Sequence, residues 1–132
     1  MGMPAAKQGD KIVGIDIHIV LIPTPPLGQT TPTPLPHPFN GSIDGGLSQD
    51  VKIMGKPAAT VDSTATNTPS HVPQGGSFQK PSSNKATIKM GSPTVKINGK
   101  MAARSGDMAM TCNDPSDLPA GQVIATGTVN IG

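Results

Sequence analysis

The stretch TIKMGSPTVKINGKMAARSGD, residues 87–107, decides the fold. Its alternating side chains and two turns predict three short strands, at residues 87–90, 94–97 and 100–104. Asn98 and Gly99 form the second turn. Asn-Gly between alternating residues is the strongest short-range hairpin signal, because a type I′ turn needs positive φ at both central positions. Ala102 and Ala103 follow the hairpin, and their side chains are small enough to let another backbone approach closely.

This unit recurs in the chain. Residues 51–59 (VKIMGKPAA) match residues 95–103 (VKINGKMAA) at seven of nine positions. A third copy is divided between the ends of the chain, with MPAAKQGD at residues 3–10 and GTVNIG at residues 127–132. Read from end to start, VNIG continues into MGMPAA much as VKING continues into KMAA. Three copies, one of them opened at the termini, predict a closed object with pseudo-threefold symmetry, since each repeat buries its apolar face against its neighbours.

The repeats set the expected domain organisation. We expect one small all-β domain over residues 1–132, built from three β-hairpin repeats, with Met1 beside Gly132. The repeat halves lie near residues 3–10, 51–62, 87–107 and 122–132. An aspartate recurs at the end of each repeat, and we interpret these residues as turn acceptors or partners of nearby basic groups: Asp10, Asp62 and Asp107.

Arms of a different composition separate the repeats. Residues 11–22 alternate, with Ile15, Ile17 and Ile19 on one face and Asp16 and His18 on the other, which is typical of a half-buried strand. Residues 23–38 hold seven prolines, which predicts polyproline II structure or a tight loop without donors for a ladder. No segment has apolar residues at helical spacing, so we expect little helix.

The composition excludes several classes of protein. The net charge is only +2, 14% of the residues are charged and the lysines are scattered, so nucleic acid would find neither a basic stripe nor an aromatic platform. No stretch approaches the ~20 apolar residues of a membrane-spanning helix, and residues 12–21 lack the cleavage pattern of a signal peptide. A single cysteine excludes an internal disulfide. We therefore expect assembly in the cytoplasm without a signal peptide.

Four residues are candidate ligands of a metal ion. Three histidines and the one cysteine are distributed over the three arms: His18, His37, His71 and Cys112. Imidazole and thiolate together suit a closed tetrahedral Zn²⁺ site. Their wide separations differ from the paired ligands of zinc fingers, so histidines in surface loops and a small buried cysteine are the alternative. Cys112 with a histidine base could also act as a nucleophile, but nothing marks an oxyanion hole, and we expect no enzyme.

Three tetrapeptides point to a known family. The chain resembles the Pro-Ala-Ala-Arg signature of the PAAR-repeat family at Pro4-Ala5-Ala6-Lys7, Pro57-Ala58-Ala59-Thr60 and Met101-Ala102-Ala103-Arg104. Lys7 and Thr60 replace the arginine and Met101 replaces the proline, so the chain departs from the literal motif while keeping the repeat. The resemblance covers nearly the whole chain. Members of the family are small conical proteins at the tips of type VI secretion systems, related extracellular injection particles and phage-like tails.

The resemblance implies a cone whose Pro- and Gly-rich arms converge at a metal-bound apex. One structural Zn²⁺ would be held there by His18, His37, His71 and Cys112, as in members of the family. The function implied is that of a structural piercing tip, which caps and sharpens one trimeric β-helical spike of a contractile injection machine. The tip would touch the target membrane transiently, and the particle would deliver it outside the cell or into a target cell.

A cap of this kind needs a threefold base that meets the strand edges of the spike, with one copy per trimer. We expect six apolar residues of the repeats to pack at or just above this interface: Val51, Ile53, Val95, Ile97, Val129 and Ile131. Two other functions stay open at this point. The chain is alternatively an adaptor that docks a separate effector or toxin on the spike tip, or an unrelated small zinc-stabilised binding domain.

Overall fold

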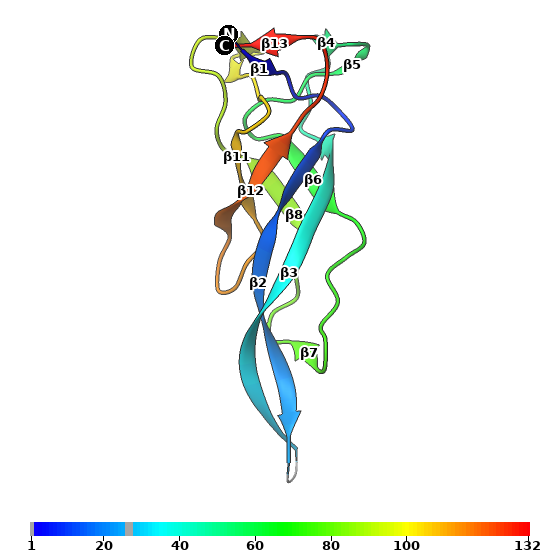
Figure 1. Cartoon of the computed structure of the whole chain (residues 1–132), viewed down its shortest axis with the longest axis vertical. Coiled ribbons are helices and arrows are strands. Elements are labelled where there is room, and N and C mark those ends of the chain that lie inside the picture. The colour runs from blue at the N-terminus through cyan, green and yellow to red at the C-terminus, as the bar shows by residue number, and fades with distance from the viewer. Residues whose placement is uncertain (1, 26–27) are drawn as a thin grey trace.

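The computed structural model describes residues 2–25 and 28–132, and Met1 and residues 26–27 lie outside the described residues. Every regular element among the described residues is a β-strand, which confirms the prediction of a small all-β domain. The molecule is elongated. It narrows from a blunt end, where both termini lie, to a single hairpin at the opposite end (Figure 1).

The middle of the molecule is a closed antiparallel barrel made from three hairpins. Its strands follow the order β12-β11-β8-β6-β3-β2, and β12 pairs with β2 to close the circle. A seventh strand of the sheet, β7 (Ser77–Phe78), pairs with β2 at Val20 and Leu21, on the edge opposite β3. The three hairpins are β2 (Lys11–Thr24) with β3 (Gln29–Gly45), β6 (Thr64–Asn67) with β8 (Lys85–Ile88), and β11 (Met108–Thr111) with β12 (Leu118–Ile124). Closure leaves the barrel without free edges, and its interior holds a core that includes Ile12, Phe39, Ile43, Ile88 and Val123.

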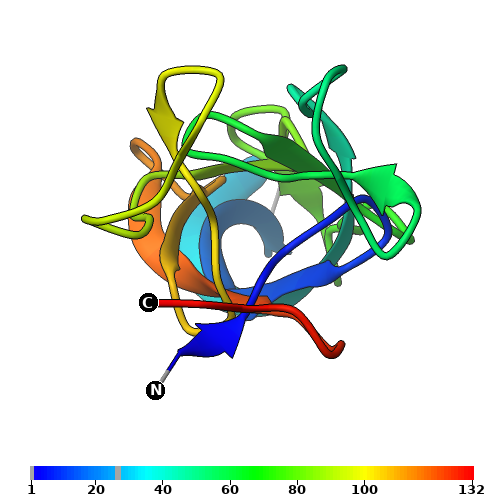
Figure 2. The ribbon, with the colours of Figure 1, turned by 90° about the horizontal axis from the view of Figure 1, so that it is seen from above.

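The blunt end consists of three short hairpins, seen as three lobes around the long axis in Figure 2. They are β1 (Met3–Pro4) with β13 (Asn130–Ile131), β4 (Lys52–Ile53) with β5 (Lys56–Pro57), and β9 (Lys96–Ile97) with β10 (Lys100–Met101). The pairing of Met3 with Ile131 completes the divided repeat, as its sequence predicted. Asn98 and Gly99 have φ values of 53° and 81°, which fits the expected type I′ turn.

A ring of backbone hydrogen bonds joins the three repeats. The N–H of Ala6 donates to Ala103 O at 2.9 Å, that of Ala103 to Ala59 O at 3.0 Å, and that of Ala59 to Ala6 O at 3.0 Å. All three alanines are fully buried. The ring confirms the pseudo-threefold symmetry and explains the paired alanines, because three backbones can meet this closely only where the side chains are methyl groups.

The proline-rich segment is a strand, which corrects the prediction of polyproline II or loop. β3 pairs with β2 through the whole ribbon, as far as Thr24 and Gln29. Proline occupies every second position, at Pro32, Pro34, Pro36 and Pro38. Pro36 lies opposite Ile17, whose N–H points away from β3 and donates to Asn113 Oδ1. Opposite residues share this orientation. The backbone nitrogens of the four prolines therefore face the outer edge of the ribbon, and the ladder between β2 and β3 loses no hydrogen bond.

The half-buried strand β2 buries its polar face. Asp16 and His18 are 0% and 1% exposed, whereas Ile15 and Ile17 are 55% and 36% exposed. This is the reverse of the usual arrangement for an alternating strand. Such a reversal requires partners for the buried carboxylate and imidazole, and these partners define the candidate site.

Candidate metal centre

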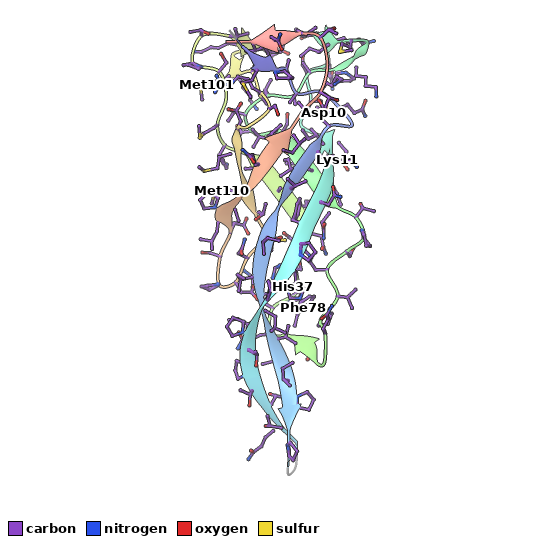
Figure 3. All side chains as sticks on the ribbon, viewed as in Figure 1. Asp10, Lys11, His37, Phe78, Met101 and Met110 are labelled. Carbon is purple, nitrogen blue, oxygen red and sulfur yellow. The ribbon has the colours of Figure 1, made fainter. Side chains whose placement is uncertain are left out.

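The polar cluster forms at the end of the barrel, where the β2–β3 ribbon begins. β2 contributes Asp16 and His18, and β3 contributes His37, which is the register partner of Asp16. Cys112 directly follows β11, and His71 lies four residues after the end of β6, in the connection to β8, so each of the three hairpins contributes to the cluster. Figure 3 places His37 and Phe78 together at this level, between the barrel and the free part of the ribbon.

The three imidazole rings surround a common centre. The ring centroid of His18 lies 5.0 Å from that of His71 and 5.4 Å from that of His37, and the His37 and His71 centroids are 5.4 Å apart. Phe78 closes one side of the cluster, with its centroid 5.5 Å from His18 and 5.4 Å from His37. The structure therefore gathers the three predicted histidines from separate parts of the chain.

The tightest group of candidate ligand atoms includes an aspartate that the sequence analysis did not assign as a ligand. Atoms of Asp16, His18, His71 and Cys112 all lie within 4.8 Å of one another, and all four residues are buried. His37 lies outside this group, although its ring centroid is 5.4 Å from those of His18 and His71. The signal for Asp16 was present in the sequence, because it shares a strand face with His18.

Asp16 is the hydrogen-bonding hub of the cluster. Its Oδ2 lies 2.9 Å from His71 Nε2 and accepts a hydrogen bond from Cys112 Sγ at 3.3 Å. Its Oδ1 accepts one from Asn113 Nδ2 at 3.3 Å. A fully buried carboxylate requires such donors or a cation. The position of Asp16 suits either a direct metal ligand or a residue that orients His71 and Cys112.

His18 is the residue that most directly indicates a missing ligand. Both of its ring nitrogens are buried and neither has a hydrogen-bond partner among residues 2–25 and 28–132. Such unpaired buried groups are rare in native proteins. Asp114 Oδ1 is 3.7 Å from Nδ1, but burial is the larger influence and lowers the pKa of His18. A neutral imidazole with an unused lone pair is the form that binds metal ions.

The other predicted ligands differ in how their ligating atoms are held, since both ring nitrogens of His71 have partners, Asn67 Nδ2 at 3.2 Å and Asp16 Oδ2 at 2.9 Å. His37 Nδ1 lies 3.0 Å from Leu35 O, so it donates a proton there and leaves the Nε2 lone pair free. Burial raises the pKa of the Cys112 thiol, and Ser82 Oγ lies 3.4 Å from its sulfur. Metal binding would replace the thiol proton, because thiolate is the ligating form.

The donor set and the unpaired imidazole together indicate that this cluster could hold a metal ion. The family model for the PAAR motif matches residues 33–115. The chain belongs to the PAAR family. This is a structural family of spike-tip proteins, which associate with the spikes of contractile injection systems. No curated protein matches the sequence. No helix among the described residues is long and apolar enough to cross a membrane.

In this PAAR protein the six residues expected at the spike interface all belong to the blunt end. Three of them are isoleucines, which are buried against the alanines of the repeats: Ile53, Ile97 and Ile131. Val51 and Val129 are 37% and 40% exposed, and Val95 is partly buried. The valines thus offer apolar surface outward, while the isoleucines form the layer beneath them.

Proposed function

We propose that this PAAR protein is the piercing tip of a contractile injection machine. The observation that carries the proposal is the difference between its two ends. One end presents three similar hairpins around an axis (Figure 2), and the other is a single narrow ribbon (Figure 1). A component that joins a threefold partner to a point requires this combination, and the two chain termini lie at the blunt end, away from the point.

The blunt end suits one trimeric β-helical spike. The end of such a trimer offers three equivalent strand edges with unpaired N–H and C=O groups. A monomer with three similar hairpins meets all three edges at once, so one copy caps one trimer by strand addition. Val51 and Val129 supply exposed apolar surface for this contact, and the isoleucines beneath them support it.

The ribbon suits entry into a target envelope. No Asp, Glu, Lys or Arg occurs between Asp16 and Asp44. The outer edge of β3 lacks donors at its four alternating prolines. On the outer edge of β2, Ile17 and Ile19 donate to Asn113 Oδ1 and Asp114 Oδ2 at 2.6 and 2.9 Å. Few charges and few free N–H groups lower the cost of moving this ribbon out of water.

A structural Zn²⁺ completes the proposal. We assign His18, His37, His71 and Cys112 as its four ligands. Asp16 lies beside them as a hydrogen-bond acceptor, for example from Asn113 Nδ2. Four protein ligands leave no open position for a reactive water, which agrees with a structural role. The ion would tie the three hairpins together where the barrel ends and the β2–β3 ribbon continues.

The proposal is tested on the tip purified together with its spike. Native mass spectrometry is expected to give one copy of this chain per spike trimer, and elemental analysis one zinc per copy. Three copies per trimer, or no complex, would contradict the capping role. A variant with residues 20–33 replaced by a short turn is expected to cap the spike normally but to reduce delivery into target cells, which separates capping from piercing.

A further inference from the structure

The three junctions between neighbouring repeats share one backbone arrangement. In each, the N–H of the residue after the paired alanines donates to the side chain three positions later. The three bonds are Lys7 N to Asp10 Oδ2 at 3.0 Å, Thr60 N to Ser63 Oγ at 2.9 Å, and Arg104 N to Asp107 Oδ2 at 2.7 Å. Lys7, Thr60 and Arg104 are therefore equivalent positions, and Ser63 takes the place that the sequence analysis gave to Asp62.

Arg104 fills its junction with a cation. Its Nη2 donates to Asp107 Oδ1 at 2.9 Å, and Nε lies 3.3 Å from both carboxylate oxygens. The hydrogen bonds to Asp107 raise the pKa of Arg104. The guanidinium also reaches two backbone carbonyl oxygens, with Nη1 donating to Gly132 O at 3.2 Å and Nη2 to Gly91 O at 3.4 Å. Gly132 belongs to the next repeat, so the side chain joins two repeats.

Lys7 fills the second junction in the same way. Its Nζ lies 3.2 Å from both carboxylate oxygens of Asp10 and donates to Thr126 O at 2.6 Å. Both members of this ion pair are buried. Two of the three junctions thus contain a basic side chain, an acidic partner and a backbone carbonyl oxygen that accepts from the cation.

The third junction has lost both the cation and its acid. Thr60 and Ser63 stand where the ion pairs of the other junctions lie, and the Thr60 hydroxyl donates to Val61 O at 3.1 Å. A hollow of about 280 Å³ occupies the space, bordered by residues 46–50, Ile97, Asn98 and Lys100. Thr60 and Ile97 are buried at its floor, and Asp50 and Asn98 are exposed at its rim.

The hollow keeps the acceptors of the Arg104 junction. By repeat alignment, Leu47 corresponds to Gly91 and Asn98 to Gly132, whose carbonyl oxygens accept from Arg104. Neither Leu47 O nor Asn98 O accepts a hydrogen bond from any residue that the structure describes. A negative charge is also present, because Asp50 stands at a rim position that threonine occupies in the other two repeats, and its Oδ2 accepts a hydrogen bond from Asn98 Nδ2 at 2.8 Å.

We infer that this hollow is a socket for an arginine or lysine side chain of a second protein. The incoming guanidinium or ammonium takes the place that Arg104 and Lys7 occupy in the equivalent junctions, donates to the free carbonyl oxygens and lies near Asp50. Lys100 also borders the hollow; its Nζ lies 3.7 Å from Asp62 Oδ2, and Asp62 is shared with Lys89, whose Nζ lies 3.7 Å from Oδ1. The identity of the second protein as the spike rests on the proposed function. The preference of the socket for a guanidinium or ammonium group does not depend on that function.

A small probe tests the socket without a partner protein. Ethylguanidinium is titrated into the metal-loaded protein while amide NMR shifts are followed, with tetramethylammonium as a control that has the same charge but no N–H donor. Saturable shifts are expected at residues 46–50, 60 and 98 for ethylguanidinium alone. Absence of saturation, or equal shifts with tetramethylammonium, overturns the inference.

Two double variants test the socket, one by filling the hollow and the other by opening a second one. Thr60→Arg with Ser63→Asp copies the Arg104 junction and is expected to abolish the shifts, while Arg104→Thr with Asp107→Ser opens a second hollow and is expected to add shifts near residues 91–94. If either protein fails to fold, Asp50→Asn still tests the site through an expected two- to fivefold loss of affinity, about the effect of one exposed ion pair. Unchanged affinity in Asp50→Asn, or retained shifts in the filled variant, overturns the inference.

The filled variant also separates the socket from the capping role. If a spike side chain enters the socket, Thr60→Arg with Ser63→Asp weakens the complex with the spike by at least tenfold. If the wild type binds ethylguanidinium but the filled variant caps the spike with unchanged affinity, the spike is excluded as the donor. Failure of the wild type to cap the spike would instead contradict the proposed function.

Discussion

The blunt end and the ribbon solve the same problem with opposite residues. Each has backbone groups that the barrel's ladder does not pair, although in the ribbon β7 pairs with β2 at Val20 and Leu21. At the blunt end, Ala6, Ala59 and Ala103 remove side-chain bulk so that three backbones can bond to one another in a ring. In the ribbon, alternating prolines remove the donors themselves. The difference shows two ways to avoid unpaired backbone groups. Where the three repeats converge, the backbones approach closely enough to bond to one another, and along the outer edge of β3 proline removes the N–H group itself.

The metal centre between these regions is expected to give the largest effect. Structural Zn²⁺ supplies ~10–16 kcal/mol of apparent folding free energy in small sites, against a net stability of ~5–15 kcal/mol for a typical domain. The double variant His71→Ala with Cys112→Ala should lose the ion in elemental analysis and unfold at a much lower temperature. Val72→Ala, a change at a neighbouring exposed residue, is the control. Full zinc retention in the double variant would reject these residues as ligands.

The alanine ring is expected to be the next most sensitive feature. Ala59→Val adds two methyl groups at a fully buried position beside the ring bonds, and overpacking of this kind costs about 1–3 kcal/mol. The same change at the exposed residue Ala120 should have little effect on stability. Urea unfolding of the two variants measures the difference. Equal stability of Ala59→Val and Ala120→Val would show that the ring tolerates larger side chains.

The ribbon predicts a sharp contrast between adjacent positions. Leu35 pairs with His18 in the orientation that places its N–H toward β2, whereas Pro36 has no donor on the outer edge. Leu35→Pro should therefore lose a ladder bond and about 1–3 kcal/mol, while Pro36→Leu should change stability little. Thermal unfolding compares them. Pro36→Leu should increase self-association, because it restores an edge donor, and a monomeric Pro36→Leu would remove the prolines' role as edge blockers.

The smallest expected effect is the pH dependence of the metal-free protein. The pKa of His18 is lowered from 6.5 by burial, so the unfolded chain binds more protons at mildly acidic pH. Stability from this group is present above pH 6.5 and falls as the pH drops further, with a slope of at most about 1.4 kcal/mol per pH unit. Urea unfolding of the metal-free wild type and of His18→Gln checks this. An equal slope in both proteins would assign the effect to another group.

The two regions also differ in how far the sequence predicts them. The base was predictable, because its determinants are identical short segments and a local Asn-Gly turn. The ribbon was not, because seven prolines in one segment indicate a loop. Only the register shows that the backbone nitrogens of Pro32, Pro34, Pro36 and Pro38 all face the outer edge of the ribbon. Register is set by partners distant in sequence, such as Asn113, which binds Ile17 N–H. Local composition carries no information about those partners.

The candidate site divides in the same manner. The residue types of His18, His37, His71 and Cys112 were sufficient to nominate them, because few other side chains in this chain bind transition metals. The sequence did not predict that Asp16 lies beside the metal ligands, since an aspartate on an alternating strand ordinarily faces water. Only the closure of the barrel shows that this face of β2 is internal. The exchange of Asp107 for Ser63 between repeats was equally hidden until the hydrogen bonds aligned them.

The unbroken course of β2 and β3 has a mechanical consequence. The two strands are 14 and 17 residues long and run from the barrel to the far hairpin, roughly 50 Å at the usual rise per residue (Figure 1). A thrust along the long axis is therefore carried by two covalent backbones that continue directly into the barrel wall. Their cross-strand bonds lie across the direction of the load, so compression loads many of them together in shear and does not open them one by one. The point resists as a column whose stiffness comes from its length of pairing.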